Sequence, residues 1–175
     1  MTTVRIQTVD TPDGPFTVIE DAQGSVLASG WDDDAAALAR RAHLDDLVDP
    51  DASHGASDTD ATRAAAAVRA YYGGDLATAA SVPVVLRGTP LQIQVWERLR
   101  DIAPGTVVGY GELAAALGRP NGARAVAGAC ARNPCGLFVP CHRVVAANGG
   151  LAGFAWGVSV KRSLLRRERA IQPEA

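Results

Sequence analysis

Residues 108–132, VGYGELAAALGRPNGARAVAGACAR, contain two short helical patterns separated by a glycine-containing turn. The first pattern follows Tyr110 and stops at Gly118, and the second, over 123–132, consists mostly of small residues. Two such helices predict a helix-turn-helix whose second helix lies close against another surface. Arg124 near the start of that helix is suited to a phosphate or base contact. A plain helical hairpin is the alternative interpretation.

The segment Val139-Pro140-Cys141-His142-Arg143-Val144 follows this pair of helices. Pro140 fixes its own φ and biases Val139 toward extended geometry, which predicts a stiff loop or strand end. A thiol reacts as its thiolate, and a nearby imidazole or guanidinium favours that form. The segment therefore predicts a nucleophile at Cys141, with a buried inert cysteine as the alternative. We also expect a buried strand over 136–139, and a hairpin over 144–151 with a primed turn at Asn148-Gly149.

The rest of the chain predicts mixed helix and sheet. We expect strands over 4–9, 16–20 and 25–31, helices over 32–47, 62–72, 90–99 and 159–170, and a mobile loop over 49–60. Trp96 has apolar neighbours at helical spacing, so we expect it in the core. Nothing before residue 83 suggests chemistry. The fold class is therefore α/β (α+β), with two domains over 1–82 and 83–175.

The net charge of −2 conceals two halves of opposite sign. Residues 1–82 carry 5 basic and 14 acidic side chains, whereas residues 83–175 carry 12 basic and 5 acidic ones. The basic half predicts contact with a polyanion, and mutual neutralisation of the two halves is the alternative. The chain has no apolar run near the ~20 residues of a membrane span and no apolar signal core, so we expect a cytoplasmic protein.

The chain has three cysteines, at 130, 135 and 141. An odd number without a signal segment fits reduced thiols. Their spacing matches no usual zinc pattern. We expect Cys130 and Cys135 to be small packing residues.

Several motifs in fixed order resemble the O6-alkylguanine-DNA alkyltransferase family. The motifs are Gly88-Thr89-Pro90-Leu91-Gln92, Tyr110-Gly111-Glu112-Leu113-Ala114, Ala123-Arg124-Ala125-Val126, Asn133-Pro134, Pro140-Cys141-His142-Arg143-Val144 and Lys161…Leu164-Leu165…Glu168. The resemblance is strong over 83–170 and weaker before it.

This resemblance implies an N-terminal ribonuclease-H-like domain and a C-terminal winged-helix-like domain that carries the helix-turn-helix. It implies direct-reversal DNA repair by a monomer, which binds double-stranded DNA through the minor groove and flips out the alkylated base. The alkyl group of O6-alkylguanine, and of O4-alkylthymine, passes irreversibly to Cys141, so each molecule acts once. The resemblance implies no cofactor and no membrane partner. Zinc-binding residues of some relatives have no counterpart here, so no metal is expected.

The resemblance also implies roles for individual residues. Glu168 orients His142, which draws the proton from Cys141, while Tyr110 assists the leaving guanine and Asn133 braces the backbone. The residues expected to contact DNA are Tyr110, Ala123, Arg124, Ala125, Gly128 and Arg132. The residues expected to line the substrate pocket are Pro140, Val144, Phe154, Ala155 and Trp156. Arg143 is expected to be structural.

Two positions depart from the family pattern. Phe154 stands where tyrosine is frequent, and Trp156 stands where some relatives have glycine. We expect an aromatic-walled pocket with altered tolerance for bulky alkyl groups. The alternative functions are a non-catalytic binder of alkylated DNA, a helix-turn-helix transcriptional regulator and a cysteine hydrolase.

Overall fold

The computed structural model describes residues 3–48 and 61–171, which form two compact units. The first unit extends to Arg87 and also includes 134–138, and the second comprises 88–133 and the chain from Val139 onward. The mixed helix-and-sheet class predicted from the sequence is confirmed. No helix within the described residues is long and apolar enough to cross a membrane. The loop expected over 49–60 lies outside the described residues.

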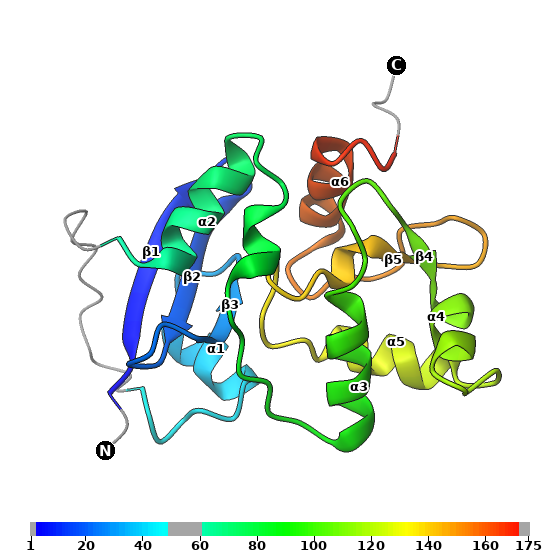
Figure 1. The fold of residues 1–175 in the computed structure, drawn as a ribbon, viewed down its shortest axis with the longest axis horizontal. Coiled ribbons are helices and arrows are strands. Elements are labelled where there is room, and N and C mark those ends of the chain that lie inside the picture. The colour runs from blue at the N-terminus through cyan, green and yellow to red at the C-terminus, as the bar shows by residue number, and fades with distance from the viewer. Residues whose placement is uncertain (1–2, 49–60, 172–175) are drawn as a thin grey trace. The chain divides into compact units, whose positions relative to one another are not determined.

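The first unit is built on an antiparallel meander with the strand order β1-β2-β3 (Figure 1). Its elements are β1 (Arg5–Thr11), β2 (Gly14–Glu20), β3 (Val26–Gly30), α1 (Ala35–Arg41), α2 (Arg63–Tyr72) and the short 3-10 helix η2 (Thr78–Ser81). All residues of β3 and the last five of β2 are buried, so both faces of these strands are covered. The meander predicted from alternating residues and turns is therefore confirmed.

Helix α1 ends earlier than predicted, at Arg41 rather than near residue 47. His43 adopts a φ of 56°, the Leu44 N–H donates to the Ala39 carbonyl at 2.8 Å, and the His43 N–H donates to the Arg40 carbonyl at 3.1 Å. This is a Schellman closure, which turns the chain so that Leu44 is buried. The prediction was wrong because no glycine marks this end in the sequence.

The strand predicted over 136–139 is also wrong, although the segment is buried. Cys135 makes a single parallel bridge to Ser29, whose N–H donates to the Pro134 carbonyl at 2.9 Å. Leu137 then adopts a φ of 72°, which no strand accommodates. The ring of Phe138 packs against Phe16 with the centroids 6.3 Å apart. These contacts make 134–138 part of the first unit.

The second unit contains the predicted helix-turn-helix. Its elements are α3 (Pro90–Leu99), β4 (Val108–Gly109), α4 (Tyr110–Ala116), α5 (Ala123–Ala131), the 3-10 helix η3 (Cys141–Arg143), β5 (Val144–Val145) and α6 (Val158–Arg167). Thr89 begins α3 with a capping box to Gln92. Trp96 is buried, as predicted, and its Nε1 donates to the Ala129 carbonyl at 2.9 Å, which links α3 to α5.

The hairpin predicted over 144–151 does not form, because β5 pairs with β4 in parallel instead. A tight turn is present, since the Gly149 N–H donates to the Ala146 carbonyl and the Ala146 N–H to the Gly150 carbonyl, both at 2.9 Å. Only Gly149 has a positive φ within this turn, whereas a type I′ turn needs two successive positive values. The primed turn was therefore a wrong prediction.

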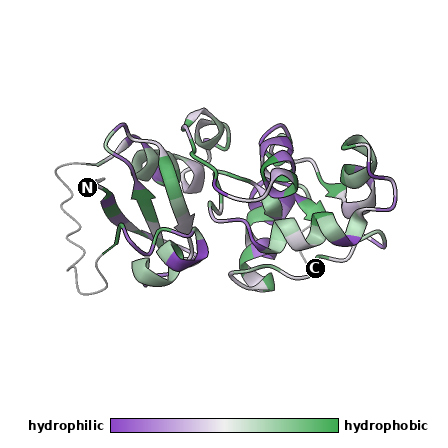
Figure 2. Ribbon diagram, turned by 90° about the horizontal axis from the view of Figure 1, so that it is seen from below, coloured by the Kyte–Doolittle hydropathy of each residue, from purple (hydrophilic) through white to green (hydrophobic). Residues whose placement is uncertain are grey.

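Helix α6 ends at Arg167, three residues before its predicted end. Arg169 has a φ of 58°, and the Ala170 N–H donates back to the Leu165 carbonyl at 2.8 Å. Glu168 consequently occupies the C-cap position, where the helix turns away. Helix α6 carries four basic side chains, whereas α5 consists mostly of small and apolar residues, and Figure 2 shows how hydropathy varies along the chain.

Candidate functional site

The parallel pairing of β4 with β5 assembles the site. Val108 pairs with Val144 and Gly109 with Val145, so the segment leading into Tyr110 lies beside the segment that follows Cys141. Each strand has only two residues, so the side chains before and after it remain close together. No local pattern in the sequence predicts the pairing of β4 with β5, because it joins residues far apart along the chain.

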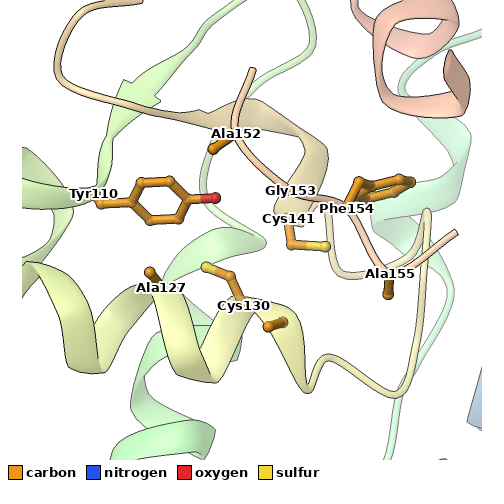
Figure 3. Close-up of a pocket in the computed structure, with 9 residues that line it drawn as sticks. Tyr110, Ala127, Cys130, Cys141, Ala152, Gly153, Phe154 and Ala155 are labelled. Carbon is orange, nitrogen blue, oxygen red and sulfur yellow. The ribbon is translucent and has the colours of Figure 1, made fainter. Parts of the chain in front are cut away.

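A cavity of about 360 Å³ lies in the second unit. It is lined by Tyr110, Ala127, Cys130, Ala131, Cys141, Ala152, Gly153, Phe154 and Ala155. Figure 3 shows the Tyr110 hydroxyl pointing into this space, with the Cys130 sulfur near it and the Cys141 sulfur directed toward Phe154 and Ala155. The volume falls in the range of pockets that bind small molecules. The walls are mainly small or apolar, so a flat, poorly hydrated group fits there best.

Asn133 fixes the loop that carries the cysteine. Its side-chain Nδ2 donates to the Val139 carbonyl at 2.8 Å and lies 3.1 Å from the Cys141 sulfur. Both Asn133 and Cys141 are buried. The amide therefore holds the backbone ahead of Pro140 and provides a hydrogen bond to the sulfur, which stabilises the thiolate form. This geometry agrees with the bracing role expected for Asn133.

Three charged or polar side chains meet behind the cysteine. His142 Nε2 lies 2.8 Å from Glu168 Oε1, and the same oxygen accepts from Arg143 Nη2 at 2.8 Å. Arg143 also donates from Nε to Glu168 Oε2 at 3.0 Å and from Nη1 to the Ile102 carbonyl at 2.6 Å. Its guanidinium is thus fully engaged within the fold, as expected for a structural arginine.

The charges around His142 determine which nitrogen of its imidazole carries the proton. Burial alone would raise the pKa of Glu168, but hydrogen bonds and charges from His142 and Arg143 outweigh it and lower that pKa to about 2. Burial lowers the pKa of His142 despite the carboxylate beside it, so the imidazole is neutral. A neutral ring facing a carboxylate carries its proton on Nε2. His142 Nδ1, which is buried and has no hydrogen-bond partner within the described residues, is then the basic atom.

Tyr110 is held in its protonated form. Burial, with smaller contributions from the negative charges of Cys130 and Cys141, raises the pKa of Tyr110 to about 12. The phenol is therefore a hydrogen-bond donor at neutral pH, and its hydroxyl faces the cavity (Figure 3). These properties suit a group that stabilises negative charge on a departing base.

Two residues of this region carry features that the sequence did not reveal. Lys161 on α6 is wholly buried, its Nζ donates to the Val144 carbonyl at 2.6 Å, and it lies 6.0 Å from the centroid of the Tyr110 ring. Cys130 was expected to be a packing residue, yet it lines the cavity, whereas Cys135 contacts the Leu27 carbonyl in the first unit. The residue types alone carried no signal that would separate the two cysteines.

The expected pocket residues are only partly brought together. Phe154 and Ala155 line the cavity, whereas Pro140, Val144 and Trp156 are not among its lining residues. Trp156 packs edge-on against Phe154 with the ring centroids 5.4 Å apart. The tryptophan therefore contacts a residue of the cavity lining without lining the cavity itself.

The residues expected to contact DNA fall in two places. Arg124, Ala125, Gly128 and Arg132 line one groove beside the start of α3, together with Asn121 in the turn. Ala123 opens α5 without lining this groove, and Tyr110 belongs to the cavity. Arg124 and Arg132 are exposed there, and the residues between them are small. The groove thus combines positive charge with room for close approach of a phosphate backbone.

Metal ligation has no evident basis in the parts of the chain that the structure describes. Within residues 3–48 and 61–171, no cluster of three or more His, Cys, Asp or Glu side chains is placed to hold an ion.

Comparisons with known proteins agree with this arrangement. The family described as 6-O-methylguanine DNA methyltransferase, DNA binding domain, matches residues 90–170. A methylated-DNA–protein-cysteine methyltransferase from Shigella flexneri is 39% identical over 160 residues, covering 91% of this chain and 92% of the relative.

Solved structures of similar proteins point the same way. The crystal structure of O6-methylguanine methyltransferase from Mycobacterium tuberculosis has a TM-score of 0.72 at 31% identity, covering 99% of this chain and 97% of that one. The structure of the Mycobacterium tuberculosis OGT in complex with DNA has a TM-score of 0.71 at 34% identity, covering 95% and 94%.

Proposed function

The chain belongs to the family of methylated-DNA–protein-cysteine methyltransferases, and we propose that Cys141 is the residue that accepts the alkyl group. The protein is a DNA-repair enzyme that binds DNA and acts by alkyl transfer. The observation that carries the assignment is the 2.8 Å contact between His142 and Glu168 directly behind a cysteine that lines a cavity. The contact supplies a base, and the cavity supplies room for a purine.

The first step is activation of the thiol. His142 Nδ1 takes the proton of Cys141, directly or through a bridging water, while Nε2 stays bonded to Glu168. Asn133 Nδ2 stabilises the resulting thiolate at 3.1 Å. This is a nucleophile, a base and an orienting carboxylate acting in series.

The second step is displacement at the alkyl carbon. The Cys141 sulfur forms a bond to that carbon as its bond to guanine O6 breaks, and the bonding electrons stay on the guanine. Tyr110 donates a hydrogen bond or proton to the departing base, which makes it a better leaving group. The product thioether has no route back to the thiol, so each protein molecule acts once. The same displacement applies to O4-alkylthymine.

DNA engagement is assigned to α5. The groove beside it carries Arg124 and Arg132 with small residues between them, which suits close approach to the minor groove. Because the cavity holds the alkyl acceptor, the lesion must leave the base stack to reach it, at a cost of a few kcal/mol. Arg124 at the helix start is the side chain that fills the vacated position. We assign the binding to a monomer.

The finer fold description belongs to the same proposal. The antiparallel meander with two helices supports a ribonuclease-H-like first unit. The helix-turn-helix followed by the short β4–β5 pair supports a winged-helix-like second unit. A non-catalytic binder or a regulator is not favoured, since the relatives matched over most of this chain are named as methyltransferases and Cys141 is present.

Intact-mass analysis after incubation with duplex DNA containing O6-methylguanine tests the assignment. We expect a gain of one methylene per protein molecule, on the peptide that contains Cys141, with no turnover. Cys141→Ser abolishes the gain. Cys135→Ser, which changes a buried cysteine outside the cavity, retains it. Methylation on another residue, or more than one lesion repaired per molecule, contradicts the proposal.

A further inference from the structure

The carboxylate of Glu168 is shared between a base and a buried positive charge. Arg143 binds both of its oxygens, from Nε to Oε2 at 3.0 Å and from Nη2 to Oε1 at 2.8 Å. Oε1 is also the atom that lies 2.8 Å from His142 Nε2. All three residues are buried, and Arg143, the most exposed of them, is only 6% exposed. The arginine therefore contacts the same oxygen that orients the base.

The guanidinium of Arg143 is also fixed at a third point. Its Nη1 donates to the Ile102 carbonyl at 2.6 Å, just after α3. A guanidinium is planar, and its nitrogens form a rigid fork that matches a carboxylate. With all three nitrogens bonded, the fork holds both oxygens of Glu168 in place. The direction in which Oε1 faces His142 consequently depends on Arg143.

The charges of these three side chains cancel when the imidazole is neutral. Without the guanidinium, Glu168 would be a buried negative charge with no positive partner in contact with it. A buried site avoids such a charge by taking up a proton, and the neighbouring imidazole is the group placed to accept it. A protonated ring cannot take the proton of Cys141. The positive charge of Arg143 therefore keeps the base available.

A second positive charge acts on the ring from a different position. Burial lowers the pKa of His142, Glu168 raises it, and the charges of Arg143 and Lys161 lower it further. The charge of Lys161 interacts with the two cavity thiols. Among the charged groups that act on the ring within the described residues, Arg143 is thus the cation bonded to the carboxylate.

We propose that Arg143 is a positioning residue for alkyl transfer, which holds Glu168 ionised and oriented and so keeps His142 free to take the thiol proton at neutral pH. The inference rests on the proposed function of Cys141. It adds to the structural role of the arginine, because a purely structural side chain would not set the pH range in which the protein reacts.

Two measurements on the full chain test this proposal. Single-turnover methyl transfer from duplex DNA containing O6-methylguanine is followed between about pH 5 and 9. Nitrogen-15 NMR of the imidazole rings reports directly on the protonation of His142. The chain has three histidines, and the signals that His142→Gln removes are those of this ring. In the wild type we expect both midpoints below 6.5, the ordinary pKa of the group.

Two variants separate the charge of Arg143 from its contacts. Arg143→Gln removes the charge, so both midpoints rise by about one to three pH units, and alkaline pH restores part of the lost rate. Arg143→Lys retains the charge but loses the two-point contact with Glu168. Its midpoints stay within about 0.5 pH unit of wild type, although its stability and its maximal rate fall.

The control is Arg98→Gln, which removes an exposed charge that pairs with Asp101 at 3.5 Å on the same side chain-rich end of α3, and both midpoints stay as in wild type. Equal His142 midpoints in wild type and Arg143→Gln overturn the inference. Should that variant not fold, Arg143→Lys decides, because a midpoint raised by about one unit or more contradicts a role of the charge. A wild-type protein that accepts no methyl group counts against Cys141, whereas the ring signals still test Arg143.

Discussion

The imidazole of His142 lies 2.8 Å from the carboxylate of Glu168, with side-chain exposures of 1% and 0%. The carboxylate has two neighbours, because Arg143 binds it through two nitrogens. Burial is the main cause that lowers the pKa of His142 and keeps it neutral, and the positive guanidinium on the other side of the carboxylate adds to this effect. The buried carboxylate of Glu168 therefore stabilises the fold around Arg143 and also determines which nitrogen of His142 carries the proton.

Replacing Glu168 with glutamine is expected to impair both properties. Arg143 loses its counter-ion in a buried position, which costs about 3–5 kcal/mol of the free energy of unfolding. Methyl transfer per folded molecule slows by at least about 100-fold, because the tautomer of His142 is no longer fixed. Urea unfolding and single-turnover repair measure the two effects. The control is Glu97→Gln, an exposed change on α3, which alters the free energy of unfolding by less than about 0.5 kcal/mol and leaves the transfer rate unchanged. An unchanged transfer rate in the Glu168 variant would contradict the roles given to His142 and Glu168.

Stability is expected to fall in mild acid through His142. Below its ordinary pKa of 6.5 the unfolded chain binds a proton that the buried ring refuses, so folding loses up to about 1.4 kcal/mol per pH unit. Glu168 adds a second loss as the pH falls from 4.5 toward about 2, since its folded pKa is the lower one. Unfolding free energies between about pH 7.5 and 5.5 measure the first effect. His142→Gln removes it, and identical pH dependence in the two proteins refutes the assignment.

Tyr110→Phe removes a hydroxyl that faces the cavity. We expect methyl transfer to slow by about 100-fold, because the leaving guanine loses its donor, with little change in stability. Tyr72→Phe is the matched control. Its hydroxyl accepts from Trp31 Nε1 at 2.8 Å and donates to Asp13 Oδ2 at 2.7 Å, so this variant loses about 1–2 kcal/mol of stability and keeps its rate. Single-turnover assays that show the same rate for Tyr110→Phe and wild type would rule out this donor.

Lys161 is expected to favour the reactive form of Cys141. Burial lowers the pKa of Lys161, whereas the negative charge of Cys141 raises it, and this interaction is reciprocal. Lys161→Met removes the charge at similar length, so alkylation of Cys141 by iodoacetamide at neutral pH slows about tenfold. Lys161→Arg retains most of the rate. If both variants slow equally, the lysine acts through packing rather than charge.

Arg124 is expected to matter for DNA and not for the chemistry. Arg124→Ala lowers repair of O6-methylguanine in duplex DNA by about tenfold or more, because nothing stabilises the flipped state. The reaction with free O6-benzylguanine base is unchanged, since that substrate needs no extrusion. Arg40→Ala, an exposed change on α1, affects neither. An equal loss with both substrates would show that Arg124 affects the transfer reaction itself rather than the binding of DNA.

Local signals in the sequence were enough to predict most of the elements. Thr89 with Gln92 marks the start of α3, and Thr62 with Gly73 marks both ends of α2. The helix-turn-helix follows from two short patterns around a glycine turn. These features depend on neighbours within a few residues, so they can be predicted from the sequence alone.

Some of the wrong predictions share a cause, which is tertiary structure overriding a local pattern. The end of α1 is set by the burial of Leu44, and the shape of 134–138 by its contacts with Ser29. The pairing of β5 with β4 replaces a local hairpin by a long-range contact. The last two depend on residues that lie far apart along the chain, whereas the end of α1 is a local closure that no glycine marks.

The candidate site was predicted mainly through family resemblance. His142, Glu168, Asn133 and Cys141 lie together as expected, because their motifs occur in order along the sequence. The position of Cys130 on the cavity wall depends on which side of α5 faces inward. A helix of small residues gives no hydrophobic stripe to settle that orientation.

Pro134–Phe138 belongs to the first unit, although it lies in sequence between two parts of the second. No single cut in the backbone therefore yields two complete halves. A fragment beginning at Gly88 would separate Phe138 from Phe16, and the backbone of Pro134 and Gly136 from Ser29, just ahead of the reactive cysteine. Any shortened version of this protein must therefore retain the residues of the first unit or redesign the segment at 134–138.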